Sequence, residues 1–130
     1  TVLDLCDIQI PDSVDGASLK QELFEAKGIE REYVHGEHSR DKEQSNQYIV
    51  TETDKYIWFT QTNIEQYFDL KQDPKEEHNR IDDPACQDRI AHLRSLLIKD
   101  LEGREEGFVQ DGKLVAGQRP ISRLQHPLHR

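Results

Sequence analysis

Alternating apolar and polar positions predict a small antiparallel sheet in the middle of the chain. Residues 48–51, 55–60 and 66–70 are rich in β-branched and aromatic side chains, and short polar segments separate them. Connections this short join antiparallel neighbours, because a parallel pair needs a long crossover. Residues 31–35 form a further candidate strand at the edge. The pattern therefore predicts a sheet of about four strands.

The spacing of apolar residues predicts one long helix, residues 84–102, after the sheet. Its apolar positions repeat every three or four residues along one face: Cys86, Ile90, Leu93, Leu97 and Leu101. Asp83 and Pro84 suit the start of this helix, and Gly103 suits the position just beyond its end. We expect the apolar face to pack on one side of the sheet, which gives an α+β fold.

The central strand is apolar on both faces. Ile57 and Phe59 point to one side of the sheet, and Tyr56 and Trp58 point to the other, because side chains alternate along a strand. A sheet with one solvated face alternates apolar with polar residues. One helix covers one side, so a loop or the tail of this chain, or else a further domain, must cover the second. We expect a further domain, with an exposed apolar face that includes Tyr56 and Trp58 and through which the isolated chain self-associates.

The pattern divides the chain into three parts. Residues 1–30 are predicted to contain the end of a helix, a connector and a short helix over 19–26. Residues 31–103 contain the sheet and the long helix. Residues 104–130 are predicted to form an extended tail with a hairpin signal at 108–115. The α+β unit is therefore preceded by a segment of helices and loops.

Local signals predict a helical turn and two small core residues. Asp73 as N-cap and Pro74 at the first helical position predict a turn that a left-handed Asn79 would end.

Cys6 and Cys86 both fall in apolar helical patterns. We therefore expect both to be buried thiols rather than disulfide partners or reactive groups.

Composition narrows the class of protein. The chain has 130 residues, of which 34% are hydrophobic and 33% charged, and a formal charge of −9. This length makes one domain with a modest core, and the acidic balance argues against nucleic-acid binding. No apolar run is long enough for a membrane span, and no signal peptide is recognisable. The chain starts at Thr1 and contains no Met, so we expect a piece of a longer protein, whose compartment the sequence does not indicate.

The densest cluster of chemical side chains is His35, Glu37 and His38, at the end of the first predicted strand. Histidine and carboxylate side chains at a strand end are candidates for binding a polar substrate through charge-assisted hydrogen bonds. A metal site is the weaker hypothesis, because this spacing matches no recognised zinc pattern and no fourth ligand is placed. Strand capping or packing at a domain interface is the purely structural alternative.

Four segments resemble the C-terminal part of bacterial arylsulfatase-type sulfatases. They are the helix, connector and D-G-A-S-L of 1–19, the R-E-Y-V-H-G-E-H of 31–38, the D-K-Y-I-W of 54–58 and the segment 67–79. The last contains Y-F-D-L followed by D-P-x-E-x-x-N and is the most specific of the four. The resemblance extends to about residue 107.

This resemblance implies a parent enzyme that hydrolyses a sulfate ester. It also implies a formylglycine nucleophile, made from a Cys in a C-x-P-S-R type motif, and a divalent cation, usually Ca²⁺, in an N-terminal catalytic domain. Neither Cys6 nor Cys86 lies in such a motif. We therefore expect no catalytic residue, metal ligand or cofactor in this chain, which should be inactive alone. The resemblance places His35, Glu37 and His38 towards the active-site mouth of the missing domain.

Two other functions remain open on the sequence. The first is a free-standing protein- or glycan-binding module with an apolar sheet face. The second is a small metal-dependent hydrolase built on the cluster at 35–38.

Overall fold

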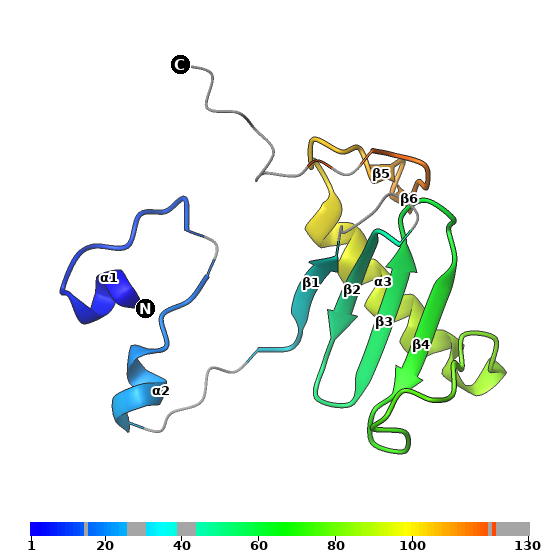
Figure 1. The fold of residues 1–130 in the computed structure, drawn as a ribbon, viewed down its shortest axis with the longest axis horizontal. Coiled ribbons are helices and arrows are strands. Elements are labelled where there is room, and N and C mark those ends of the chain that lie inside the picture. The colour runs from blue at the N-terminus through cyan, green and yellow to red at the C-terminus, as the bar shows by residue number, and fades with distance from the viewer. Residues whose placement is uncertain (15, 26–30, 39–43, 120, 122–130) are drawn as a thin grey trace. The chain divides into compact units, whose positions relative to one another are not determined.

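The computed structural model describes residues 1–14, 16–25, 31–38, 44–119 and 121 (Figure 1). The chain forms two compact units, Thr1–Arg31 and Glu32–Arg130. Among its described residues, the first unit contains two short helices, α1 (Val2–Leu5) and α2 (Lys20–Glu25). Within this unit the Leu19 amide donates to Thr1 Oγ1 at 2.9 Å, and Lys20 Nζ lies 3.1 Å from an Asp7 carboxylate oxygen. The short helix expected over 19–26 is thus present.

The second unit contains the predicted antiparallel sheet, and its strands follow chain order. The strands are β1 (Val34–His38), β2 (Asn46–Val50), β3 (Asp54–Phe59) and β4 (Glu65–Asp69). β1 begins later than expected and continues through Gly36, which pairs with Tyr48 of β2. A Cβ on Gly36 would lie 2.2 Å from the Tyr48 ring. The glycine therefore belongs in the strand, because it lets the tyrosine ring cross over its backbone.

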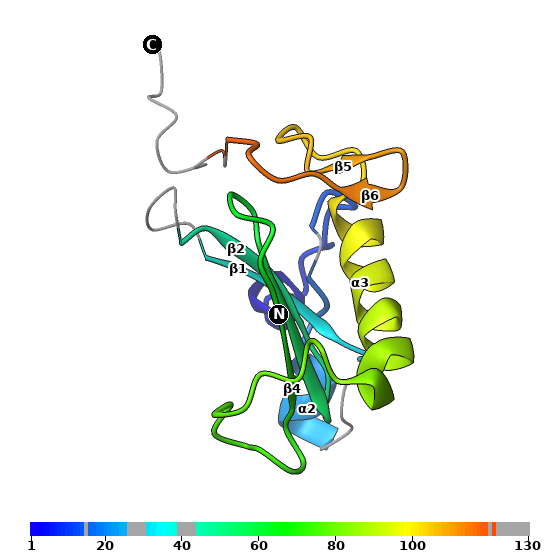
Figure 2. The same cartoon turned by 90° about the vertical axis from the view of Figure 1, so that its right-hand side faces the viewer.

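The predicted long helix covers one face of the sheet. A short 3-10 turn (Pro84–Cys86) leads into α3 (Gln87–Leu101). Asp83 is the N-cap that the sequence predicts, and its Oδ1 accepts a hydrogen bond from the Ala85 amide at 2.9 Å. Gly103 follows the helix with φ of 75°, as a left-handed C-terminal residue. Figure 2 shows α3 against one side of the sheet, which confirms the α+β fold.

The core lies between this sheet face and α3. Its buried residues come from the strands, the helix and the segment after the helix: Ile49, Tyr56, Trp58, Tyr67, Cys86, Ile90, Leu93, Leu97, Leu101 and Phe108. Trp58 meets Phe108 edge to face, with ring centroids 5.7 Å apart. Burying four large aliphatic side chains of α3 stabilises the unit by roughly 1.5–3 kcal/mol for each, before the entropy of ordering them is subtracted.

The expectation that Tyr56 and Trp58 lie on a face left open by the chain is wrong. Both are 0% exposed, because they point towards α3 and lie under it and Phe108. The second face of the sheet is formed by the alternate set of strand residues, which includes Ile57 and Phe59, both half-buried. Val34, at 50% exposed, adds to this face from β1. Self-association through the second face stays a prediction.

The segment after β4 differs from the predicted helical turn. Residues 71–80 form turns, with Glu76 rather than Asn79 in the left-handed region at φ of 57°. Asp73 Oδ2 accepts from the His78 amide, five residues on, so it closes a wider loop than a helix N-cap would. Asn79 Oδ1 accepts from the Tyr67 amide of β4 at 3.0 Å. The loop thus satisfies part of the outer edge of the sheet.

The predicted hairpin is present, and one of the two cysteines is buried as predicted. The hairpin signal is confirmed by β5 (Val109–Gln110) and β6 (Lys113–Leu114), which pair across an Asp-Gly turn with both turn residues at positive φ. Cys86 is buried as expected, whereas Cys6 is exposed, because α1 is a single turn with no buried residue. Most of the extended segment predicted after Val115 lies outside the described residues. Within the part of the chain that is described, no helix has the length and apolar character needed to cross a membrane.

Candidate functional site

An open hollow of about 260 Å³ lies beside β1, and its lining includes two of the three residues singled out by the sequence. It is lined by His35, Gly36, Glu37 and Arg104. His35 and Glu37 alternate with Gly36 along β1, so their side chains share the sheet face that carries α3. His38 lies on the other face and is exposed. The structure therefore brings His35 and Glu37 together, adds Arg104, and separates His38 from them.

A buried glutamine connects the two residues of β1. Gln47, on the neighbouring strand β2, is only 3% exposed. Its Nε2 donates to Glu37 Oε2 at 3.3 Å, and its Oε1 lies 2.9 Å from His35 Nε2. Since the amide nitrogen faces Glu37, the amide oxygen faces His35, whose Nε2–H can donate to it. The Gln47 side chain thus fixes the positions of both His35 and Glu37.

The last turn of α3 holds His35 from its other side. Asp100 Oδ2 lies 3.4 Å from His35 Nδ1, and Asp100 Oδ1 accepts from the Tyr33 hydroxyl at 2.8 Å. That hydrogen bond, together with burial and the charges of Asp100 and Glu32, raises the pKa of Tyr33 to about 12. Tyr33 is therefore a neutral donor at physiological pH, and it keeps the carboxylate of Asp100 in place.

Glu37 and Arg104 form the charged rim of the hollow. Arg104 Nη2 donates to Glu37 Oε2 at 3.0 Å and also lies 3.5 Å from Glu106 Oε1. Burial opposes ionisation of Glu37, but the charge of Arg104 and hydrogen bonds from Gln47 and Arg104 outweigh it. The pKa of this carboxyl therefore lies below its usual value. At neutral pH the rim holds one guanidinium between two carboxylates.

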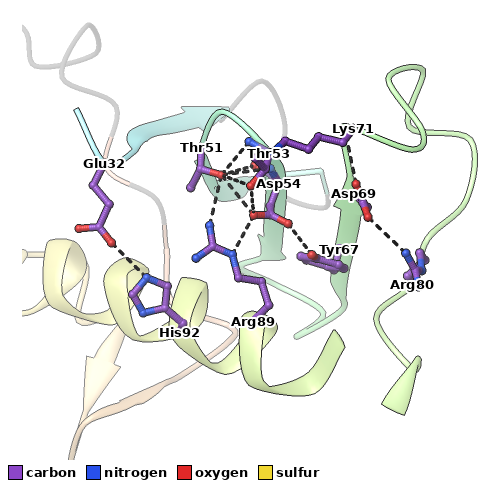
Figure 3. Close-up of polar contacts among 10 residues, drawn as sticks. All are labelled: Glu32, Thr51, Thr53, Asp54, Tyr67, Asp69, Lys71, Arg80, Arg89 and His92. Carbon is purple, nitrogen blue, oxygen red and sulfur yellow. Dashed lines mark hydrogen bonds and ion pairs between the residues drawn. The ribbon is translucent and has the colours of Figure 1, made fainter. Parts of the chain in front are cut away.

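A second polar cluster lies where β2 turns into β3, and its bonds are already made. Asp54 is 6% exposed and accepts from the Tyr67 hydroxyl at 2.5 Å, from Arg89 Nε at 2.8 Å and from Thr53 Oγ1 at 2.5 Å (Figure 3). Arg89 comes from α3, so the cluster ties the helix to the sheet. Thr51 Oγ1 accepts from the Asp54 amide at 3.0 Å. Because Asp54 binds donors on several elements at once, we assign the cluster a structural role.

The described residues do not fit the divalent cation of a sulfatase. Among them, one carboxylate and histidine group has ligand atoms within 4.8 Å of one another, namely Asp73, Glu77 and His78. Glu77 and His78 are exposed, and Asp73 Oδ2 already accepts from the His78 amide at 2.7 Å. The metal hypothesis for residues 35–38 is also unsupported, because His35 and His38 lie on opposite faces of β1. We therefore derive no metal chemistry from this chain.

Comparison with known proteins agrees with the fold and the sequence motifs. Residues 1–103 match the family described as N-sulphoglucosamine sulphohydrolase, C-terminal. The match covers most of the chain, which therefore belongs to this family of sulfatase C-terminal regions. The resemblance to sulfatases drawn from the sequence is thus confirmed.

Individual relatives are sulfatases of greater length. The chain is 52% identical over 126 residues to an arylsulfatase of Clostridium perfringens (strain 13 / Type A), covering 97% of this chain and 26% of that protein. Among solved structures, a 2-O GAG sulfatase, BT1596, is 26% identical with a TM-score of 0.72, over 89% of this chain and 26% of its own. A putative sulfatase from Bacteroides thetaiotaomicron VPI-5482 is 27% identical with the same TM-score and coverage.

A further structure shares the fold alone. BT4656, solved in complex with its substrate D-glucosamine-2-N,6-O-disulfate, has a TM-score of 0.68 at 22% identity and covers 77% of this chain and 22% of its own. The chain thus spans about a quarter of the length of the sulfatases it matches. It corresponds to a sulfatase C-terminal subdomain.

Proposed function

We propose that this chain is the C-terminal subdomain of a sulfuric-ester hydrolase of the arylsulfatase type. In this proposal it completes the fold beside an N-terminal catalytic domain and lines the substrate pocket with His35 and Glu37. The observation that carries the proposal is the placement of these two side chains in one hollow with Arg104. The division at 31, with 104–130 as a following segment, is part of the same proposal.

The hollow is suited to binding rather than to bond breaking. Gln47 and Asp100 hold His35 between two acceptors, and Gln47 and Arg104 hold Glu37 between two donors. Fixed side chains of this kind orient a polar substrate at a small entropic cost. In the sulfatases that this chain resembles, a formylglycine and a divalent cation supply the hydrolytic chemistry. We assign both groups to the catalytic domain.

The substrate pocket is tested by changing His35 in the longer sulfatase that contains this chain. His35→Ala is expected to raise KM about tenfold, or about 1.4 kcal/mol, for the sulfate ester that the enzyme hydrolyses best, because the imidazole lines the hollow and its removal leaves Gln47, which fixes Glu37, without its second partner. His38→Ala is the matched control, because the His38 side chain extends from the opposite face of β1. Initial rates of sulfate release give KM and kcat for each.

The outcome depends on comparing the two histidines. A KM that rises for His35→Ala and not for His38→Ala, at unchanged melting temperature, supports the proposed pocket. Equal kinetics for both variants and the unmodified enzyme would remove His35 from the pocket. A larger effect for His38→Ala would place the substrate on the opposite face of the sheet.

A further inference from the structure

We infer that the hollow beside Arg104 binds two neighbouring hydroxyl groups of a sugar ring, and not the sulfate group of the substrate. This inference rests on the proposed function, because it names what the hollow recognises when the chain is part of a sulfatase. It assigns the binding to Glu37 and Arg104 acting as a pair.

The balance of charge around the hollow disfavours a sulfate. The guanidinium of Arg104 lies between the carboxylates of Glu37, at 3.0 Å, and Glu106, at 3.5 Å. Behind His35 lies a third carboxylate, Asp100, at 3.4 Å. Even with His35 counted as a cation, these groups carry more negative than positive charge. An incoming sulfate would therefore meet repulsion that the neutralised guanidinium does not offset.

The unused hydrogen-bonding groups match a pair of hydroxyls. Both contacts that Glu37 makes with described residues use Oε2, from Gln47 and from Arg104, so Oε1 keeps its capacity to accept. Both contacts that the Arg104 side chain makes within the described part of the chain use Nη2, so its Nε and Nη1 groups keep their capacity to donate. One hydroxyl can donate to the carboxylate while its neighbour on the ring accepts from the guanidinium. Adjacent hydroxyls of a hexose offer this combination, whereas a sulfate offers acceptors alone.

The pair is held in place before any ligand binds. Gln47 is almost fully buried and fixes Glu37 from the strand side, so we assign it the role of a positioning residue. The Glu106 side chain is only 9% exposed and holds Arg104 from the other side. Two side chains fixed by buried neighbours lose little conformational freedom on binding, which favours recognition of weak neutral ligands such as hydroxyl groups.

The test uses the longer sulfatase with two kinds of substrate. One is 4-nitrophenyl sulfate, which has no sugar, and the other is a panel of glucose and galactose monosulfates carrying the ester at each position. For the best substrate of the panel, Arg104→Ala and Glu37→Gln should each lower the ratio of its kcat/KM to that of 4-nitrophenyl sulfate at least tenfold. The control Glu52→Gln, an exposed carboxylate in the connection between β2 and β3, should leave this ratio unchanged.

Glu37→Gln gives the sharpest discrimination, because the two ligand chemistries predict opposite signs. If the hollow binds hydroxyls, loss of the carboxylate weakens binding of the sugar sulfate. If it binds the sulfate, loss of a nearby negative charge tightens binding of both substrates, and that result would overturn the inference. Two variants of the positioning residue remove the amide group that donates to Glu37. Gln47→Leu and Gln47→Glu should both lower the ratio, as Glu37→Gln does, and Gln47→Glu does this with the shape of the side chain kept.

Failure of the inference and failure of the proposed function give different results. A longer protein that hydrolyses no sulfate ester at all would contradict the proposed function. Hydrolysis of 4-nitrophenyl sulfate without any hexose monosulfate, or equal losses on both substrates in Arg104→Ala, would leave the sulfatase assignment intact and overturn the sugar inference.

Discussion

Replacing Trp58 with alanine is expected to lower the free energy of unfolding of the chain by about 4 kcal/mol. Trp58 is 0% exposed, contacts Phe108 edge to face, and donates from Nε1 to Asn63 Oδ1 at 2.9 Å. The substitution removes the largest buried side chain from the space between β3 and α3. It also deprives Phe108 of its main aromatic neighbour, so part of the hairpin loses its anchor.

Urea denaturation followed by far-ultraviolet circular dichroism measures this loss. Fluorescence would not serve, because Trp58 is the single tryptophan of the chain. Ile64→Ala is the control, since Ile64 is 55% exposed and its loss should change the free energy by less than about 0.5 kcal/mol. A loss below about 1 kcal/mol for Trp58→Ala would contradict the packing of β3 under α3.

The second large effect is expected at Asp54, where Asp54→Ala should cost about 3 kcal/mol at neutral pH. The substitution leaves the Tyr67 hydroxyl without its buried acceptor and Arg89 without its carboxylate partner. Asp54→Asn keeps the shape and removes the charge, so it separates the charge contribution from the packing contribution. Chemical denaturation of the three proteins gives the differences.

The effect of Asp54 depends on pH in a defined direction. Burial opposes ionisation of Asp54, but hydrogen bonds from Thr53, Tyr67 and Arg89 outweigh it and hold its pKa below the usual value. The folded state therefore binds this proton less readily than the unfolded state does. The stabilisation is complete above the unfolded pKa of about 4 and is lost as the pH falls through the lower folded pKa. The gap between the unmodified chain and Asp54→Asn should narrow below about pH 4, and a gap that widens there would contradict the cluster.

Elements set by local chemistry were predictable from the sequence. The β3 strand, the α3 helix with its Asp83 cap and the Asp111-Gly112 hairpin all follow from residues that are close together in the chain. The conformation of the loop at 73–79 was not predictable, because Asp73 accepts from the His78 amide instead of capping a helical turn. A short Asp-Pro signal is compatible with either arrangement.

Contacts between distant residues could not be read from the pattern. Alternation separates the Tyr56 and Trp58 set from the Ile57 and Phe59 set, but both are apolar, so only the packing of α3 and Phe108 decides which set is buried. Arg104 was missed as a member of the hollow because it lies 67 residues from Glu37 in the sequence. The same holds for Asp54 and Arg89, which are 35 residues apart.

The relatives and the geometry of β1 argue against the two other functions that the sequence left open. A free-standing binding module does not account for a chain that matches about a quarter of an arylsulfatase at 52% identity. A small metal-dependent hydrolase would need His35 and His38 to converge, and they lie on opposite faces of β1. The comparisons support a sulfatase subdomain, and we propose that its catalytic groups lie in another domain.

The most direct test of the proposed assignment compares sulfate release by the 130-residue chain with that by the longer sulfatase that we propose contains it. Both proteins are assayed with 4-nitrophenyl sulfate in the presence and absence of Ca²⁺, after conversion of the formylglycine precursor in the longer one. We predict metal-dependent turnover by the longer protein and none by the chain alone. Turnover by the chain alone, or an inactive longer protein, would contradict the assignment.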